Sequence, residues 1–184
     1  SAEARSSEIY LRSLIKHAQD VITIIEANGI VRFESPAVER MLGFTPEERV
    51  RTNVFDYMHP DDKVRVLGVL ASIVPIPGAM RKVVFRYRHK NGSWRTLESI
   101  GTNQLIDPAV HGVVINSRDV TEREEAQRLI QESAAQFSSL VANIPGAVYR
   151  CASDSDWTME FISDAIEAIS GYSAQEFIDK KRSY

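Results

Sequence analysis

The feature that constrains this chain most is an internal repeat, in which residues of the same type return after 126 to 128 positions. Three matched segments carry it: Ser13-Leu14-Ile15 with Ser139-Leu140-Val141, Phe33-x-Ser35-x-Ala37-Val38-Glu39 with Phe161-x-Ser163-x-Ala165-Ile166-Glu167, and Gly43-Phe44-Thr45-Pro46-Glu47-Glu48 with Gly171-Tyr172-Ser173-Ala174-Gln175-Glu176. The offset grows by two between the first match and the others, which places two extra residues in the polar loop 152–157. The chain therefore contains a first copy (residues 13–124) and the first half of a second copy (139–184).

Two Asn-Gly pairs set the local structure of the first copy. Asn28-Gly29 separates the β-rich runs 21–25 and 30–33, and Asn91-Gly92 separates the runs 82–89 and 94–106. Both residue types tolerate positive φ, so each pair predicts a two-residue hairpin turn. With a last strand at 112–119, the pattern predicts five antiparallel strands.

Helical segments lie before and between these strands. A partial apolar stripe predicts a helix over 3–17, Gly43 ends a short helix after Leu42, and Thr45-Pro46-Glu47-Glu48 has the form of a capping box. A longer helix is expected from Pro60 to about Val74, where two prolines follow. The predicted fold class is α+β, with helices on one face of a five-stranded antiparallel sheet.

A further helix is predicted from Thr121 to residue 143, with Thr121 and Glu124 as its capping box. Apolar and small residues recur along it with alternating spacings of four and three, at Ala126, Ile130, Ser133, Phe137, Leu140 and Ile144. This spacing fits a short coiled-coil seam, in which Ile130, Phe137 and Leu140 would join two copies of the chain. It fits equally a helix that packs on its own domain.

The motifs of the first copy, in their order, resemble those of the PAS family of sensory domains. The motifs are Phe33-x-Ser35-x-Ala37, Met41-Leu42-Gly43-Phe44, His59-Pro60-Asp61-Asp62, Phe85-Arg86-Tyr87-Arg88-His89-Lys90-Asn91-Gly92-Ser93-Trp94 and Asn116-Ser117-Arg118-Asp119-Val120-Thr121-Glu122-Arg123. The resemblance implies an N-terminal helix over 1–18, a PAS domain over 19–120, a linker helix over 121–143 and the N-terminal half of a second PAS domain over 144–184. It also implies that Asp119 and Thr121 join the last strand to the outgoing helix and relay a signal.

No residue pattern indicates catalysis or a bound metal. The four histidines are scattered, no phosphate loop or nucleophile motif is present, and the helix over 61–74 contains no histidine that would hold haem. Light-sensing flavin relatives carry an Asn-Cys-Arg-Phe motif, and the one cysteine, Cys151, lies elsewhere. We therefore expect a fragment that is not an enzyme and binds neither haem nor flavin.

The interior of the first domain leaves two alternatives open. Apolar residues of the long helix and of the strands could enclose a core or a pocket: Val64, Leu67, Leu70, Val83, Phe85, Ile100, Val113 and Ile115. The first alternative is a filled core. The second is a pocket for a small apolar ligand.

Composition limits the partners and the location of the chain. The net charge of −3 gives no basis for binding nucleic acid, and no run of about 18 apolar residues is available to span a membrane. A single cysteine is typical of a reducing cytoplasm. We expect a cytoplasmic homodimer that relays a signal through the linker helix to a downstream output domain, such as a histidine kinase or a cyclic-dinucleotide enzyme. The alternative is a protein-interaction module with no small ligand.

Overall fold

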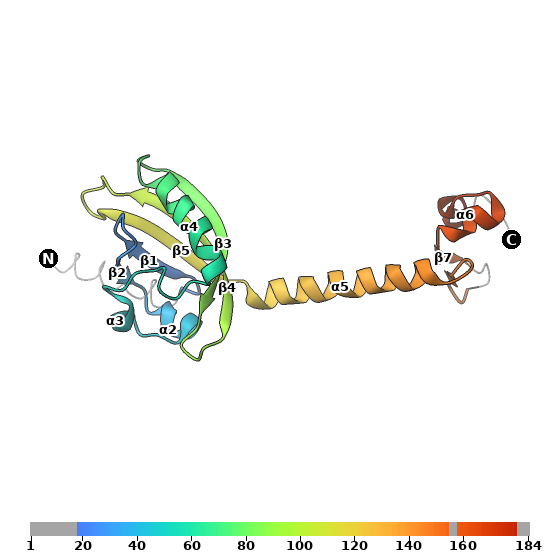
Figure 1. Cartoon of the computed structure of the whole chain (residues 1–184), viewed down its shortest axis with the longest axis horizontal. Helices are drawn as coiled ribbons and strands as arrows, with labels where there is room; N and C mark the ends of the chain where they lie inside the picture. The colour runs from blue at the N-terminus through green and yellow to red at the C-terminus, as the bar shows by residue number, and fades with distance from the viewer. Residues whose placement is uncertain (1–17, 155–157, 180–184) are drawn as a thin grey trace. The chain divides into compact units, whose positions relative to one another are not determined.

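The computed structural model describes residues 18–154 and 158–179, so the predicted N-terminal helix, apart from Ala18, lies outside the described residues. The chain divides into two compact units between Glu124 and Glu125 (Figure 1). The two copies of the repeat fall in different units.

The first unit is built on a five-stranded antiparallel sheet with the strand order β2-β1-β5-β4-β3. Its strands are β1 (Val21–Ile25), β2 (Val31–Glu34), β3 (Met80–Arg88), β4 (Trp94–Gln104) and β5 (Gly112–Asp119). Gly29 and Gly92 have φ of 88° and 91°, the left-handed values that the two predicted hairpin turns require. The predicted α+β fold with a five-stranded antiparallel sheet is confirmed.

Three helices, α2 (Ala37–Leu42), α3 (Pro46–Arg49) and α4 (Pro60–Ile73), lie on one face of this sheet (Figure 1). Local sequence signals set their ends. Gly43, at φ 77°, ends α2, and the Thr45 side chain accepts from the Glu48 N–H in the predicted capping box of α3. The strand residue Asn103 supplies the end of α4, because its side-chain amide donates to the carbonyls of Ile73, Val74 and Ile76.

The apolar core lies between the helices and the inner face of the sheet. Strand β1 shows how the pleat builds it, since Val21, Thr23 and Ile25 are buried while Ile22 and Ile24 are half-buried. One core cluster surrounds Val21, and a second joins Ile25 to the C-terminal end of α4. The inner face therefore carries the residues that decide what the domain can hold.

The second unit contains most of α5 (Thr121–Asn143) and a shorter hairpin and helix pair. These elements are β6 (Tyr149–Cys151), β7 (Met159–Ile162), α6 (Ala165–Ser170) and α7 (Ala174–Ile178). Gly171 ends α6 at φ 80°, and Ser173 and Glu176 form a capping box at α7, as Gly43, Thr45 and Glu48 do in the first copy.

The two hairpins share their register as well as their sequence pattern. Thr23 pairs with Glu34 in the first, and Tyr149 pairs with Ile162 in the second. In both, the register shifts at the third pair, between Ile24 and Ile25 or between Arg150 and Cys151. The repeat seen in the sequence is thus a repeat of backbone structure. None of the helices in the described part of the chain combines the length and apolarity needed to span a bilayer.

Candidate functional site: the core cavity and the junction with α5

A cavity of about 80 Å³ lies in the first unit, between α4 and the inner face of the sheet. That volume is several times the roughly 10–15 Å³ that one water molecule needs on the same measure. Five of the eight residues proposed from the sequence line it: Leu70, Val83, Phe85, Val113 and Ile115. Its walls are mostly apolar, and the interior of this domain is therefore not completely filled.

Two proposed pocket residues on α4 lie elsewhere, because the helix presents a different stripe to the sheet. Val64 is 81% exposed and Leu67 is 47% exposed. The stripe that lines the cavity contains Val66, Val69, Leu70 and Ile73. The sequence of α4 is compatible with two overlapping apolar stripes. The stripe that faces the sheet is the one consistent with the hydrogen bond between Asp62 and the Arg86 N–H of β3, which holds the helix in one rotation about its axis.

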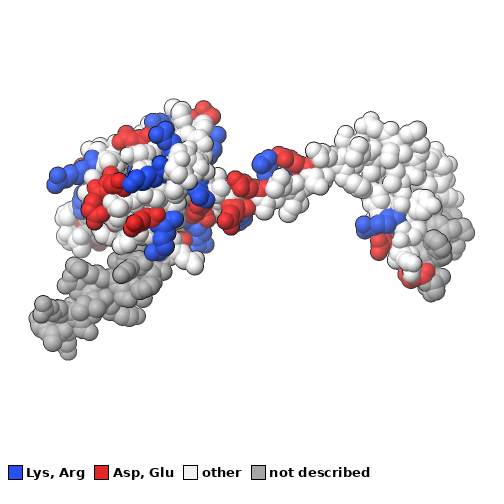
Figure 2. Space-filling view, turned by 90° about the horizontal axis from the view of Figure 1, so that it is seen from below, with Lys and Arg blue, Asp and Glu red and all other residues white. Residues whose placement is uncertain are grey.

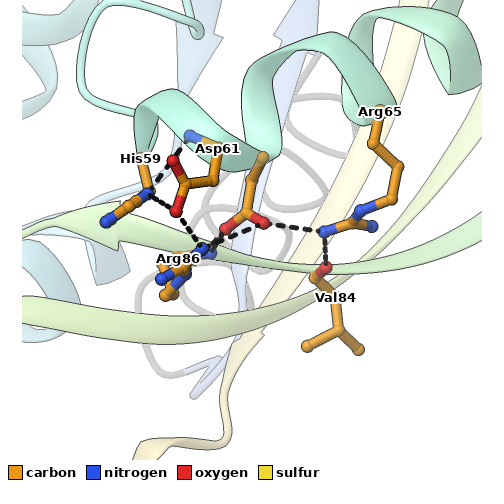
Figure 3. Close-up of polar contacts among 6 residues, drawn as sticks. His59, Asp61, Arg65, Val84 and Arg86 are labelled. Atoms are coloured by element: carbon orange, nitrogen blue, oxygen red, sulfur yellow. Dashed lines mark hydrogen bonds and ion pairs between the residues drawn. The ribbon is translucent and has the colours of Figure 1, made fainter.

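That contact is a latch between α4 and β3, made by Asp62, Arg86 and Arg65 (Figure 3). The Asp62 carboxylate accepts from the Arg86 backbone N–H at 2.9 Å and from the Arg86 Nε at 3.0 Å, and Arg65 donates to the Val84 carbonyl at 2.8 Å. Burial raises the pKa of Asp62, but these hydrogen bonds from Arg86 and Arg65 lower it more, to about 2. The latch therefore holds one wall of the cavity in place.

The third residue outside the cavity is Ile100, which is 37% exposed. Strand β4 alternates, and the residues that it turns toward the cavity are Leu97, Ser99 and Gly101. The sequence analysis proposed Ile100 because it is apolar, but the alternation of the strand directs Ser99 and Gly101 toward the cavity and Ile100 away from it. The Ser99 hydroxyl is paired with that of Ser117 on β5, at 2.7 Å between the oxygens.

A buried polar cluster forms another part of the cavity wall, and the sequence analysis missed it. Arg49 Nε donates to Glu34 Oε2 at 3.0 Å, and the two side chains are 2% and 3% exposed. Thr23 donates to the other Glu34 oxygen at 2.8 Å, and Arg49 Nη2 donates to the Tyr87 hydroxyl. All four residues line the cavity.

Aromatic rings surround the Arg49 guanidinium. Its central carbon lies 4.9 Å from the centre of the Tyr57 ring, 5.3 Å from that of Tyr87 and 5.7 Å from that of Phe44. Burial lowers the pKa of Arg49, but Tyr87 and Glu34 raise it more, so the group stays charged. Burial also raises the pKa of the Tyr87 hydroxyl, which is therefore neutral.

The repeat contained a signal for this cluster. From the sequence alone, Arg49 and Glu34 are typical of surface residues. At the matching positions of the second copy, however, Phe177 replaces Arg49 and Ile162 replaces Glu34. Apolar residues at matching positions indicate that these sites face a core.

Asp119 and Thr121 contact each other at the junction between β5 and α5, but Thr121 does not have the predicted capping role. The Thr121 hydroxyl donates to Asp119 Oδ1 and accepts from the Thr96 N–H of β4 at 2.8 Å. The Thr121 N–H also donates to Asp119, at 2.9 Å. The prediction that the Thr121 hydroxyl caps α5 was wrong, because this hydroxyl accepts from β4 and the Glu124 N–H donates to the Val120 carbonyl. The Asp119 carboxylate accepts the N–H of Thr121, the first residue of the helix.

Along α5, the proposed seam residues stay at the surface of this single chain. Ile130, Phe137 and Leu140 are 70%, 53% and 68% exposed, and no residue of α5 is buried. In Figure 2 charged side chains of both signs are scattered over the visible face of the first unit, whereas that of the second unit is mostly uncharged.

The residues that were considered for metal or haem do not gather. Among residues 18–154 and 158–179, no three His, Cys, Asp or Glu side chains come close enough to hold a metal ion. His59 precedes α4 and accepts from the Asp61 N–H at 3.3 Å, with its ring centre 4.7 Å from that of Trp94. The absence of haem and flavin stays a prediction.

Comparison with known proteins gives a consistent result for the first unit. A family profile described as the PAS fold matches residues 31–108. White collar 2 protein of Neurospora crassa is 32% identical over 88 residues, which are 48% of this chain and 16% of that protein. Sensor protein FixL of Bradyrhizobium diazoefficiens is 28% identical over 138 residues, 72% of this chain and 27% of that protein. The chain thus spans about a quarter or less of the length of these relatives.

Solved structures agree on the fold. The PAS domain of an HTR-like protein from Haloarcula marismortui matches with a TM-score of 0.56 and 18% identity, over 64% of this chain and 95% of that one. A domain of a sensory box sensor histidine kinase/response regulator from Geobacter sulfurreducens matches with a TM-score of 0.50 and 26% identity, over 62% and 94%.

Proposed function

Since the first unit of this chain is a PAS domain, we propose that the chain is a sensory and regulatory region without catalytic activity of its own. A change in the cavity wall would pass through the Asp119–Thr121 junction to α5 and on to a downstream output domain. A histidine kinase or a cyclic-dinucleotide enzyme would be the output. Similarity to a sensor protein and to a sensor histidine kinase domain supports this class.

The observation that carries the proposal is the bond from Thr96 to Thr121. Strand β4 lines the cavity through Leu97, Ser99 and Gly101, and the residue before them, Thr96, donates its N–H to the Thr121 hydroxyl. The Thr96 carbonyl in turn accepts from the Val120 N–H at 2.9 Å. A shift of β4 therefore acts directly on the first turn of α5.

Hydrogen exchange of the Glu124 amide tests this route. That amide donates to the Val120 carbonyl in the first turn of α5. We expect Ser99→Ala, which removes one partner of the Ser99–Ser117 pair, to change its exchange rate at least threefold. In a Thr121→Val background the same substitution should leave the rate unchanged, while Thr121→Ser, which keeps the hydroxyl, should preserve the coupling. An equal response in all three backgrounds would rule out the junction as the route.

A second function, dimerisation, is favoured by the exposed apolar residues of the second unit. Ile169 is 64% exposed, in addition to the seam residues Ile130, Phe137 and Leu140. Soluble monomers rarely expose large contiguous apolar patches. A homodimer would also give the relay its mechanical element, because two α5 helices could rotate or shift register against each other.

Light scattering of the full chain at micromolar concentration tests the dimer. We expect Phe137→Glu, on the seam, to raise the dissociation constant at least tenfold, because it places a charge in the interface. Ala135→Glu, on the opposite side of the helix, is the matched control and should leave the constant within a factor of two. A parent chain that stays monomeric would contradict the dimer.

A further inference from the structure

One nitrogen of the buried cluster has no hydrogen-bond partner among the described residues. Arg49 Nε and Nη2 are occupied by Glu34 and Tyr87, but buried Nη1 meets no acceptor in residues 18–154 or 158–179. A buried donor without a partner costs roughly 1–3 kcal/mol, and more when it is charged. Among the described residues, this nitrogen is therefore free to donate to an acceptor that enters the cavity.

The cavity has room for that acceptor. Arg49 lines the same cavity of about 80 Å³ as the apolar side chains of α4 and the sheet. Most of this wall offers neither donors nor acceptors, so an occupant would contact apolar groups over most of its surface. Ser99 and Ser117 also line the cavity, but their hydroxyls pair with each other, whereas Arg49 Nη1 is a buried donor without a partner among the described residues.

Charge balance selects the chemistry of the occupant. Arg49 and Glu34 neutralise each other, and Tyr87 is neutral. A carboxylate or phosphate would leave one uncompensated negative charge in a buried site, which is costly. A neutral carbonyl, ether or hydroxyl oxygen accepts the Arg49 hydrogen bond without that cost.

We propose that Arg49 Nη1 and this cavity form a binding site for a small, neutral, mostly apolar molecule that carries one oxygen acceptor. This differs from a purely apolar pocket, because the oxygen is required for affinity and fixes the orientation of the molecule. The site does not depend on the relay, since a ligand can bind without changing α5.

Binding of three probes to the full chain, followed by NMR titration, tests the site. The probes are cyclohexanone, methylenecyclohexane, which has a similar shape but no oxygen, and cyclohexanecarboxylate, which carries a charge. We expect the ketone to bind at least tenfold more tightly than either of the others, because only it offers a neutral acceptor. Its addition should also shift the Arg49 side-chain N–H signals.

A double variant controls for the shape of the cavity. Glu34→Ile with Arg49→Phe installs the residues that the second copy has at these positions and removes the donor together with its counter-charge. In this variant the preference for the ketone over the hydrocarbon should disappear. If the variant does not fold, a crystal structure of the parent chain with cyclohexanone decides, with the ketone oxygen expected at about 2.7–3.2 Å from Arg49 Nη1.

Three results would overturn the site. They are equal affinity for ketone and hydrocarbon in the parent chain, a ketone oxygen bound elsewhere, and no binding of any probe to a cavity filled by ordered water on Arg49 Nη1. None of them bears on the relay, whose test compares variants without any ligand, so the two proposals fail separately.

Discussion

The two copies of the repeat build the same hairpin and helices around different chemistry. Glu34 and Arg49 form a buried ion pair in the first copy, whereas the matching residues of the second copy are Ile162 and Phe177. The backbone is nevertheless shared: the hairpins have the same register shift, and Gly43 and Gly171 end their helices at φ of 77° and 80°.

The difference shows that the motif itself does not require a buried charge. Replacing a buried ion pair by apolar residues is often neutral or stabilising, whereas removing one partner is strongly destabilising. The pair in the first copy is therefore better explained by a property of that cavity than by the needs of the fold. Substitutions that exchange the chemistry of the two copies can test this explanation.

The largest effect should come from breaking the pair on one side. Glu34→Ala leaves the charged Arg49 buried without its counter-charge, and we expect it to lower the free energy of unfolding by about 3–5 kcal/mol. The double variant Glu34→Ile with Arg49→Phe should instead stay within about 1 kcal/mol of the parent chain. Urea denaturation of the full chain, followed by tryptophan fluorescence, measures both.

The comparison of the copies would fail in either of two ways. A double variant as unstable as Glu34→Ala would mean that the pair is a structural requirement of the first copy. A Glu34→Ala variant as stable as the parent would mean that Arg49 finds other compensation in the folded chain.

An intermediate effect is expected at the latch on α4 of the first copy. The pKa of Asp62 falls from 3.8 to about 2 on folding. Because the folded value is the lower one, the carboxylate stabilises the fold above pH 3.8, and this stabilisation is lost as the pH falls through about 2. Asp62→Asn should therefore cost about 2 kcal/mol at neutral pH.

The pH dependence distinguishes the latch from a packing effect. The difference between Asp62→Asn and the parent chain in urea denaturation should shrink steadily as the pH is lowered from 5 toward 2. Asp61→Asn is the control, since that side chain is 73% exposed and should change stability by less than about 0.5 kcal/mol. A difference that is constant with pH would exclude the proposed ionic contribution.

The sequence predicted the frame of this molecule better than the interior of its core. Asn-Gly turns, glycine helix ends and capping boxes act over a few residues, so Gly29, Gly43 and Thr45 could be assigned from local pattern alone. Whether Leu67 and Ile100 point toward the cavity depends on the rotation of α4 and on the pleat of β4. Long-range contacts, such as the one between Asp62 and Arg86, determine both. The role of Thr121 was missed for the same reason, because its partner Thr96 lies 25 residues away.

The smallest predicted effect concerns a serine that has the same hydrogen bonds in both copies. Ser35 Oγ accepts from the Ile22 N–H at 3.0 Å, and Ser163 Oγ accepts from the Val148 N–H at the same distance. Each serine N–H also donates to the carbonyl of the same partner residue, Ile22 or Val148, at 2.9 Å in the first copy and 2.8 Å in the second. Each serine therefore stabilises the start of its hairpin through the same pair of hydrogen bonds.

Removal of either hydroxyl should have the same cost in both copies, whatever the chemistry of the neighbouring core. We expect Ser35→Ala and Ser163→Ala each to lose about 1 kcal/mol locally, the usual contribution of one such bond. The amides of Ile22 and Val148 should then exchange about fivefold faster in the respective variants, as measured by hydrogen exchange and NMR. Each variant serves as the control for the other, since the amide of the unmodified copy should keep its parent rate. A large effect in the first copy with none in the second would mean that the second hairpin depends on other contacts, and that the shared register has different causes in the two copies.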